Sequence, residues 1–219
     1  MTSTLRNNKE IRSRDPKRTK AQILDAALTE FATHGYDGSK VQKIAQSAAC
    51  NPRLIYHYFG SKDGLYLAAL RHIYAEIRAK ETDLNLDALP PRAAIVRLAE
   101  FTFDFFDQNG PFVTITRSEN LLGGQFVRKI PEISEISNPL IDKISAVLER
   151  GVADGVFRPG VDPLQLYVSI VALSAHHINA AHTLSATFGT DFLADDWRNA
   201  RRAHVVTFVS AALSMGDHA

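Results

Sequence analysis

The stretch SKVQKIAQSAACNPRLIYHYFGSK, residues 39–62, decides the fold of this chain. Its apolar residues recur at helical spacing on both sides of residues 48–50, a pattern that predicts two short helices joined by a three-residue turn. Asn51 can cap the second helix, and Pro52 suits its first position, where a missing amide hydrogen costs nothing. Two helices joined in this way are typical of a helix-turn-helix, whose second helix enters the major groove of DNA.

The flanking residues extend this pair to a three-helix head. Asp15 and Pro16 mark the start of an earlier helix, which Gly35 ends. Ser39 and Gln42 form a candidate capping box for the helix that follows. A basic arm lies at the start of the head and contains Arg6, Lys9, Arg12, Arg14, Lys17, Arg18 and Lys20.

Charge is distributed unevenly along the chain. Residues 1–80 hold 14 Lys and Arg against 7 Asp and Glu, whereas residues 81–219 hold 11 against 17. A basic head can neutralise phosphates, and an acidic body would repel them. This division favours DNA binding over a simpler alternative, in which the head is a small helical bundle with a solvated charged face.

The span ILDAALTEFATHGYDGSKVQKIAQSAACNPRLIYHYFGSKDGLY, and above all its core IYHYFGSKDGL, resembles the N-terminal domain of the tetracycline-repressor (TetR) family. The resemblance covers roughly residues 17–77. It implies an all-α dimer with a DNA-reading head and a ligand-binding body. On this basis residues 1–15 are a flexible basic arm, residues 16–78 the DNA-binding domain with its motif at 40–59, and residues 79–219 a ligand-binding and dimerisation domain.

Two positions depart from the family pattern. Ala49 lies in the turn where glycine is common, and a positive φ there would cost alanine about 1 kcal/mol. Leu54 replaces a small hydroxyl residue and can make only apolar contacts, such as with a thymine methyl group. The operator sequence can therefore differ from those of relatives.

The second helix of the motif has an inner and an outer face. Ile55 and Phe59, four residues apart, are expected to anchor the inner face, and Arg53, Leu54 and His57 are expected to face base edges. Phosphate contacts are expected around the rim of the motif. The complete set of predicted DNA contacts is Ser39, Lys40, Asn51, Pro52, Arg53, Leu54, Tyr56, His57 and Lys62.

The rest of the chain also reads as helices. Ser61 is expected to cap a helix that reaches about Lys80 and links head to body. The segment 82–91, rich in Asp, Leu and Pro, ends that helix and marks the domain boundary. Further helices are predicted over 92–107, 111–122, 138–151, 162–187 and 195–213. No alternating strand pattern occurs, so the predicted class is all-α with about nine helices.

Composition sets further bounds. The chain has 219 residues, 45% of them hydrophobic, which suffices for a core. No apolar run approaches the ~18–20 residues of a membrane span, and the charged N-terminus lacks the apolar segment of a signal peptide. A single cysteine, Cys50, excludes an intramolecular disulfide and favours a reducing cytoplasm. We expect Cys50 to be a small, partly buried filler of the turn rather than a redox switch.

The sequence gives little support for catalysis. Gly123-Gly124 lacks the Lys-Ser or Lys-Thr of a phosphate-binding loop, and neither a Gly-x-Ser-x-Gly nor a His-Glu-x-x-His motif occurs. His176, His177 and His182 lie close in sequence, but their angular spacing on a helix separates them by roughly 120–140°. We therefore predict no enzyme activity, no cofactor and no metal site.

A small-molecule site is predicted in the body. Phe101 and Phe105 share a helical face, and apolar clefts with a few polar groups commonly bind small molecules. The predicted lining consists of Phe101, Phe105, Arg117, Asn120, His176 and Asn179. The region DPLQLYVSIVALSAHHINAAHTLSATFG is similar to regulators of pyrimidine use and nicotinate degradation, which implies a small, polar, planar catabolite as effector.

Assembly is predicted to involve the last two long helices. A single recognition helix covers too few base pairs, so palindromic double-stranded operator DNA requires a homodimer. The predicted seam contains Leu166, Ile170, Leu173, Val205, Phe208 and Val209. Together these expectations describe a transcriptional repressor that a small-molecule effector releases. The alternative is a helical protein–protein interaction module with a basic head.

Overall fold

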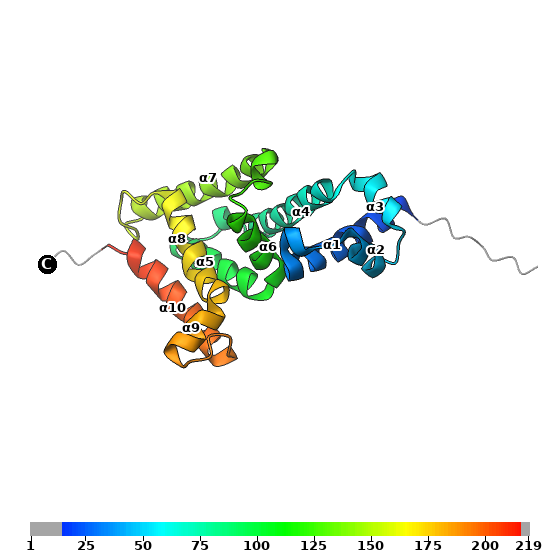
Figure 1. Ribbon diagram of the computed structural model, residues 1–219. Helices are drawn as coiled ribbons and strands as arrows, with labels where there is room; N and C mark the ends of the chain where they lie inside the picture. The colour runs from blue at the N-terminus through cyan, green and yellow to red at the C-terminus, as the bar shows by residue number, and fades with distance from the viewer. Residues whose placement is uncertain (1–14, 216–219) are drawn as a thin grey trace, which may run out of the picture.

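The computed structural model describes residues 15–215, and all regular structure in this range is helical. The head contains the first three helices, and the body contains α5 to α10 (Figure 1). Helix α4 runs from one to the other. The helices are α1 (Pro16–Gly38), α2 (Val41–Ser47), α3 (Pro52–Phe59), α4 (Lys62–Thr82), α5 (Pro91–Gln108), α6 (Gly110–Leu121), α7 (Glu132–Ala153), α8 (Pro163–Asn179), α9 (Ala181–Phe188) and α10 (Asp195–Leu213), with 3-10 turns at Leu86–Ala88 and Val127–Lys129.

Four helices begin where the sequence predicted them. The side-chain oxygens of Asp15, Asn51, Ser61 and Asp162 each accept a hydrogen bond from a backbone amide in the first turn of the following helix, at 2.7–3.0 Å. Each bond satisfies a donor that the helix itself leaves without a partner. At Gly35 the backbone leaves helical geometry, with φ 66° and ψ −179°, so the predicted end of regular helix is confirmed, although α1 is assigned to Gly38.

The predicted capping box at Ser39 is wrong. Ser39 is buried, and its hydroxyl donates to the carbonyl oxygens of Glu30, at 3.1 Å, and of Gly35. Helix α2 has Lys40 at its cap without a side-chain cap bond, while a Glu30 carboxylate oxygen accepts from the Lys40 amide at 3.2 Å. The Ser39 hydroxyl, which the sequence pattern paired with the Gln42 amide, thus bonds to α1 instead.

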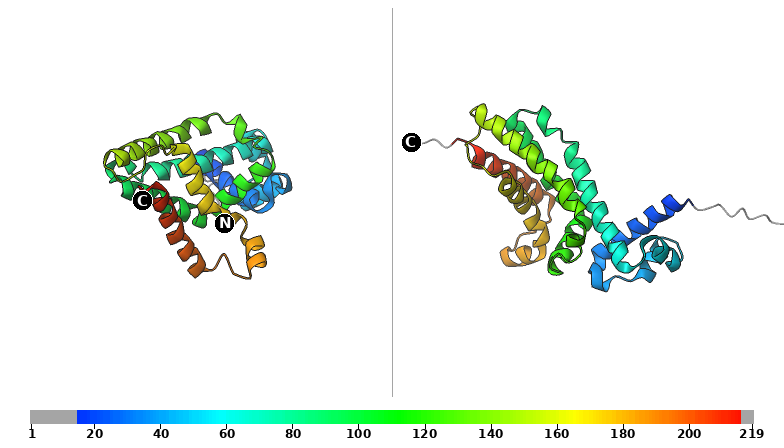
Figure 2. Two further views of the ribbon diagram at one scale, coloured as in Figure 1. Left: turned by 90° about the vertical axis from the view of Figure 1, so that its left-hand side faces the viewer. Right: turned by 90° about the horizontal axis from the view of Figure 1, so that it is seen from above.

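Two helix boundaries in the body also differ from prediction. Helix α7 begins at Glu132 rather than at Asn138, with Pro139 inside it. Two glutamates in its first turn favour that earlier start through the helix dipole, which offsets part of the cost of an internal proline. The helix predicted over 162–187 is two helices, because Ala180 has φ −112° and ψ 13°, and α9 protrudes from the body (Figure 2).

Two clusters of buried side chains hold the molecule together. The head core includes Ile23, Phe31, Ile44, Ile55, Leu65 and Tyr66, and it continues into Phe105, Phe112, Ile115 and Phe126. The body core includes Leu98, Phe103, Ile144, Val147, Ile170, Val205 and Val209. Because α6 packs on α1 and contributes to the head core, the head rests directly on the body as well as on α4.

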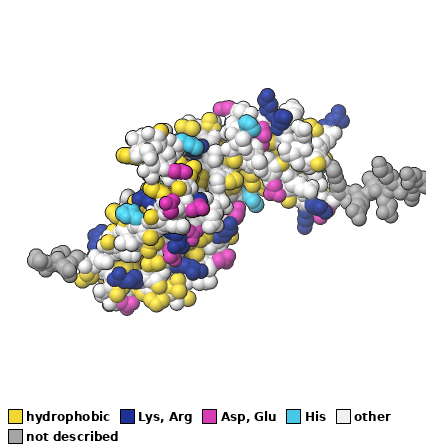
Figure 3. Space-filling model, turned by 90° about the horizontal axis from the view of Figure 1, so that it is seen from below, with side chains coloured by type: hydrophobic (Ala, Val, Ile, Leu, Met, Phe, Trp, Pro, Cys, Tyr) yellow, Lys and Arg dark blue, Asp and Glu magenta, His cyan; other side chains and the backbone are white. Residues whose placement is uncertain are grey.

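Ion pairs fasten α10 to α5. The guanidinium of Arg202 lies 2.7 Å from Asp104 and 3.0 Å from Glu100, and that of Arg198 lies 2.9 Å from Asp107. Asp104 and Glu100 raise the pKa of Arg202, mainly through the hydrogen bonds that Arg202 donates to Asp104. Acidic and basic side chains accordingly lie interleaved over the middle of the molecule on the face seen in Figure 3.

Candidate nucleic-acid interface and effector groove

The turn between α2 and α3 has a positive φ at Ala49. Residues 48–50 form the turn, and Ala49 has φ 49°, in the left-handed region where alanine is strained by about 1 kcal/mol. The Cys50 amide donates to the Ala45 carbonyl oxygen at 2.9 Å and closes the turn. Cys50 is half-buried and packs against the head core, as predicted.

Helix α3 is fixed from its inner side. Ile55 is fully buried, and Phe59 packs against the head core with the Lys20 ammonium 5.6 Å from its ring centroid. Leu54, expected on the outer face, is half-buried against the same core, because the helix lies close to its neighbours along this edge. The exposed side chains of α3 and its cap are Asn51, Pro52, Arg53, Tyr56 and His57.

The flanking positions divide into two groups. Lys40 is exposed, whereas Ser39 is buried and its hydroxyl is occupied within the head. The Lys62 ammonium lies 4.7 Å from the ring centroid of Tyr36 and donates to the Asp37 carbonyl oxygen at 3.4 Å, so its first partners are internal. Sequence reasoning missed Lys43, an exposed cation on α2, although its spacing of three from Lys40 places both on one helical side.

Tyr36 links this region to α4. Its hydroxyl donates to a carboxylate oxygen of Asp63, in the first turn of α4. Burial, followed by the hydrogen bond to Asp63, raises the pKa of Tyr36 to about 12, so the phenol keeps its proton at neutral pH. The centroid of the Tyr36 ring also lies 4.5 Å from that of Phe126, so Tyr36 connects the start of α4 with the body.

The predicted ligand-binding residues do not line one common cavity within the described residues. Phe105 is buried in the head core, and Phe101 packs beside it at a centroid distance of 5.9 Å. Arg117 and Asn120 are exposed on α6, and Arg117 Nη1 donates to the Asn179 carbonyl oxygen at 3.4 Å. Two of them, His176 and Asn179, line a groove.

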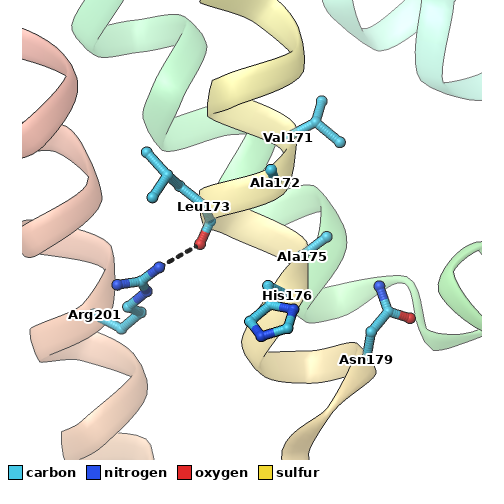
Figure 4. Close-up of a pocket in the computed structure, with 7 residues that line it drawn as sticks. All are labelled: Val171, Ala172, Leu173, Ala175, His176, Asn179 and Arg201. Atoms are coloured by element: carbon cyan, nitrogen blue, oxygen red, sulfur yellow. Dashed lines mark hydrogen bonds between the residues drawn. The ribbon is translucent and has the colours of Figure 1, made fainter. Parts of the chain in front are cut away.

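That groove lies along the second half of α8 and has a volume of about 520 Å³ (Figure 4). Its lining is Val171, Ala172, Leu173, Ala175, His176 and Asn179 of α8, together with Arg201 of α10. Arg201 donates from Nη2 to the Leu173 carbonyl oxygen at 3.0 Å. Sequence reasoning missed Arg201, although its position one residue before Arg202 turns it away from the face that binds α5.

The neighbouring histidine, His177, is structural. Its ring stacks on Phe103 with centroids 5.2 Å apart and lies 5.3 Å from Trp197. Burial, followed by the charge of Arg201, lowers its pKa to about 4, so the ring is neutral at pH 7. Among the described residues, no group of three potential ligand side chains could hold a metal ion.

The predicted seam residues fall into two classes. Leu166, Ile170, Val205 and Val209 are buried in the body core, where α5 packs against both α8 and α10. Leu173 is half-buried and Phe208 is exposed. The outer face of α8 and α10 exposes Leu164, Val168 and Phe208 instead, each with about half of its surface accessible.

The fold and the exposed face of α3 define the class of the protein. It is a helix-turn-helix regulator with a helical body. The family described as "Bacterial regulatory proteins, tetR family" matches residues 23–69, and "Tetracyclin repressor-like, C-terminal domain" matches residues 91–209. The chain belongs to the tetR family. Within residues 15–215, no helix is both long and apolar enough to cross a membrane.

Curated relatives and solved structures agree with this assignment. The chain is 34% identical over 200 residues to the HTH-type transcriptional repressor NicS of Pseudomonas putida, covering 91% of this chain and 92% of that protein. It is 29% identical over 182 residues to the HTH-type transcriptional regulator RutR of Escherichia coli, covering 81% and 82%. A tetR-family protein from Rhodococcus RHA1 shares the fold with a TM-score of 0.70 at 17% identity, covering 91% of this chain and 99% of that one.

Proposed function

We propose that this protein is a homodimeric, cytoplasmic transcriptional repressor that binds a palindromic operator and leaves it when a small molecule binds the body. The observation that carries the proposal is the exposed face of α3, which the head core and the Asn51 cap hold rigidly at one end of the molecule. In this proposal residues 16–78 read DNA, and residues 79–219 bind the effector and dimerise.

The proposed DNA contacts follow from exposure and charge. Arg53 and His57 face base edges, with Leu54 touching a thymine methyl group from the edge of the helix. Lys40 and Tyr56 contact phosphates, and Lys62 does so from its place over the Tyr36 ring. At Ser39 only the backbone can contribute, because its side chain is buried. Asn51 and Pro52 lie at the start of α3, where the positive end of the helix dipole favours a nearby phosphate.

Base and phosphate contacts are expected to separate in a salt series. Arg53→Ala should cost about 1–3 kcal/mol of operator binding and relax specificity at one base pair. Lys40→Ala should weaken binding to all sequences alike and lower the salt slope by about one unit. Titration of duplexes with and without a palindrome measures both effects. A wild-type protein without sequence preference would instead support a basic interaction module.

The proposed dimer uses the outer face of α8 and α10. Leu164 and Val168 on the first half of α8 and Phe208 on the second half of α10 are exposed apolar side chains, and we propose that they belong to one surface. Two copies packed through this surface would form a four-helix interface. Half-sites about 34 Å apart on the operator then match the two recognition helices.

Phe208→Asp is expected to give a folded, helical monomer that has lost operator affinity. The side chain is 53% exposed, so the new carboxylate stays hydrated in the monomer but would be buried without a partner in the seam. Leu121→Asp is the matched control, since Leu121 is 85% exposed on α6. Analytical ultracentrifugation measures the oligomeric state of both variants. A Phe208→Asp protein that stays dimeric would place the seam elsewhere.

The effector is proposed to bind the groove at His176 and Asn179, near Arg117, rather than the interior around Phe101 and Phe105. The groove supports this location because it combines apolar walls with polar groups and has a volume typical of small-molecule sites. A small, polar, planar catabolite fits these dimensions.

Binding of effector and operator is expected to be mutually antagonistic. A coupling free energy of about 1–3 kcal/mol would lower operator affinity roughly 5–150-fold, and operator must weaken effector binding by the same factor. Calorimetry of effector binding with and without operator tests this equality. Equal effector affinities in the two conditions would show that the ligand is no inducer, and tighter binding with operator would make it a co-repressor.

A further inference from the structure

Arg201 differs from the two other arginines around it on α10. Arg198 and Arg202 each meet carboxylates of α5, at 2.9 Å and 2.7 Å. Arg201 has no carboxylate within ion-pair distance among residues 15–215, and its one hydrogen bond there goes to the backbone oxygen of Leu173. The sequence thus places three cations on one helix and supplies acidic partners to two of them.

The uncompensated guanidinium is partly withdrawn from water. Arg201 is half-buried, and its Nε lies in the interior without a hydrogen-bond partner in the described chain. Burial lowers the pKa of Arg201, and the adjacent His177 ring is neutral at pH 7 and supplies no negative charge. A partly buried charge without a counter-charge costs free energy that an anion would recover.

The groove beside Arg201 has the composition of a site for an amphipathic molecule. Its walls are mostly aliphatic, from Val171 to Ala175, and His176 and Asn179 stand at the end near α9. The groove occupies the second half of α8, whereas the exposed Leu164 and Val168 of the proposed seam lie in the first half. The groove and the proposed seam are therefore neighbouring parts of one face, and Leu173 borders both.

We infer that this groove binds a small organic acid whose carboxylate pairs with Arg201 while its apolar or aromatic body lies along α8. The inference rests on the proposed function, in which the same groove holds the effector, and adds the chemical class of that effector. Arg201 is the specificity-determining residue. His176 and Asn179 can bond a polar substituent on the far side of the ligand.

The geometry of a guanidinium explains the preference for an acid. Nη1 makes no hydrogen bond within the described residues, and Nη2 uses one hydrogen for Leu173, so donors remain for a carboxylate. A charge-assisted bond of this kind is about twice as strong as a neutral one. A primary amide of the same shape would meet Arg201 with its carbonyl oxygen only and without charge.

The test compares acids with their amides on the full chain in the absence of DNA. Benzoate, phenylacetate, cyclohexanecarboxylate and hexanoate, each beside its primary amide, are titrated at millimolar concentrations by calorimetry. We expect at least one acid to bind roughly 10–100-fold more tightly than its amide. Arg201→Gln should remove that preference and Arg201→Lys should restore part of it, because the charge returns without the planar fork.

Arg158→Gln is the matched control. Arg158 also bonds a backbone oxygen, that of Ala212 at 2.8 Å, but lies outside this groove. Arg158→Gln should leave the preference for acids intact. Circular dichroism melts verify that all three variants fold. The inference is overturned if no acid exceeds its amide, or if Arg201→Gln keeps the preference. It is equally overturned if Arg201→Gln dissociates the dimer while no acid is preferred, since Arg201 would then pair with a second copy.

Operator binding separates this inference from the proposed function. Ligand-free Arg201→Gln should bind operator as the wild type does, because the residue is remote from α3. A wild-type protein that binds operator normally but prefers no acid over its amide would refute the inference alone. Tight acid binding that leaves operator affinity unchanged would refute the effector role and leave the acid site standing.

Discussion

Gly64→Ala is expected to abolish specific operator binding and to destabilise the head by about 1–3 kcal/mol. A Cβ at this position would lie 2.0 Å from the carbonyl oxygen of Phe59, the last residue of α3. Contacts below 3.0 Å essentially never occur, so the end of α3 must move by about 1 Å or more. Such a shift displaces Arg53 and His57 from base edges, where each contact is worth about 1–3 kcal/mol.

Gly110→Ala provides the control for this substitution. Gly110 is the first residue of α6, and a Cβ there would meet nothing within 4 Å. Alanine should be neutral or slightly stabilising at that position. Thermal unfolding and electrophoretic mobility shifts on operator DNA measure both variants. Operator binding by Gly64→Ala within twofold of the wild type would show that α3 tolerates the displacement.

Local chemistry made much of this molecule predictable. The caps at Asn51, Ser61 and Asp162 were predicted because a cap needs only residues within one turn, and each is confirmed. The same kind of reasoning failed at Ser39, whose hydroxyl bonds carbonyl oxygens of α1. A capping pattern in the sequence specifies a possible bond, and tertiary neighbours nine residues away offered a competing one.

Faces of helices were predicted better than the partners that cover them. Helical spacing placed Ile170 and Val205 on apolar faces, but it could not say whether a core or a second copy covers each face. The structure buries both in the body core and leaves Phe208 exposed. The groove escaped prediction for a related reason, since Arg201 and Leu173 are 28 residues apart and only the packing of α10 on α8 joins them.

A buried polar triad ties α4 to α8 and was also invisible to sequence spacing. Arg78 Nη1 lies 2.8 Å from the Glu81 carboxylate, Arg78 Nη2 donates to the Tyr167 hydroxyl at 3.0 Å, and that hydroxyl donates to Glu81 at 2.9 Å. Glu81 is 2% exposed. Helix α4 follows the recognition helix α3 in the chain and connects the head with the body. The triad therefore fixes the far end of α4 against α8.

Arg78→Met is expected to destabilise the protein by about 3–5 kcal/mol, because it leaves the Glu81 carboxylate buried without its counter-charge. Burial already raises the pKa of Glu81, and loss of Arg78 removes the largest opposing effect. A carboxyl group whose folded pKa exceeds its unfolded pKa loses stability as pH rises, so the deficit should be larger at pH 7 than at pH 5. Urea unfolding at both pH values measures it.

Two further variants show whether charge burial is the cause. Arg71→Met removes another cation of α4, whose partner Glu132 is 3.8 Å away and exposed, and should cost no more than about 1 kcal/mol. Combining Arg78→Met with Glu81→Gln should recover most of the loss, since the neutral amide can still accept the Tyr167 hydroxyl hydrogen. If the double variant is as unstable as Arg78→Met, packing of the Arg78 side chain rather than its charge holds α4 against α8.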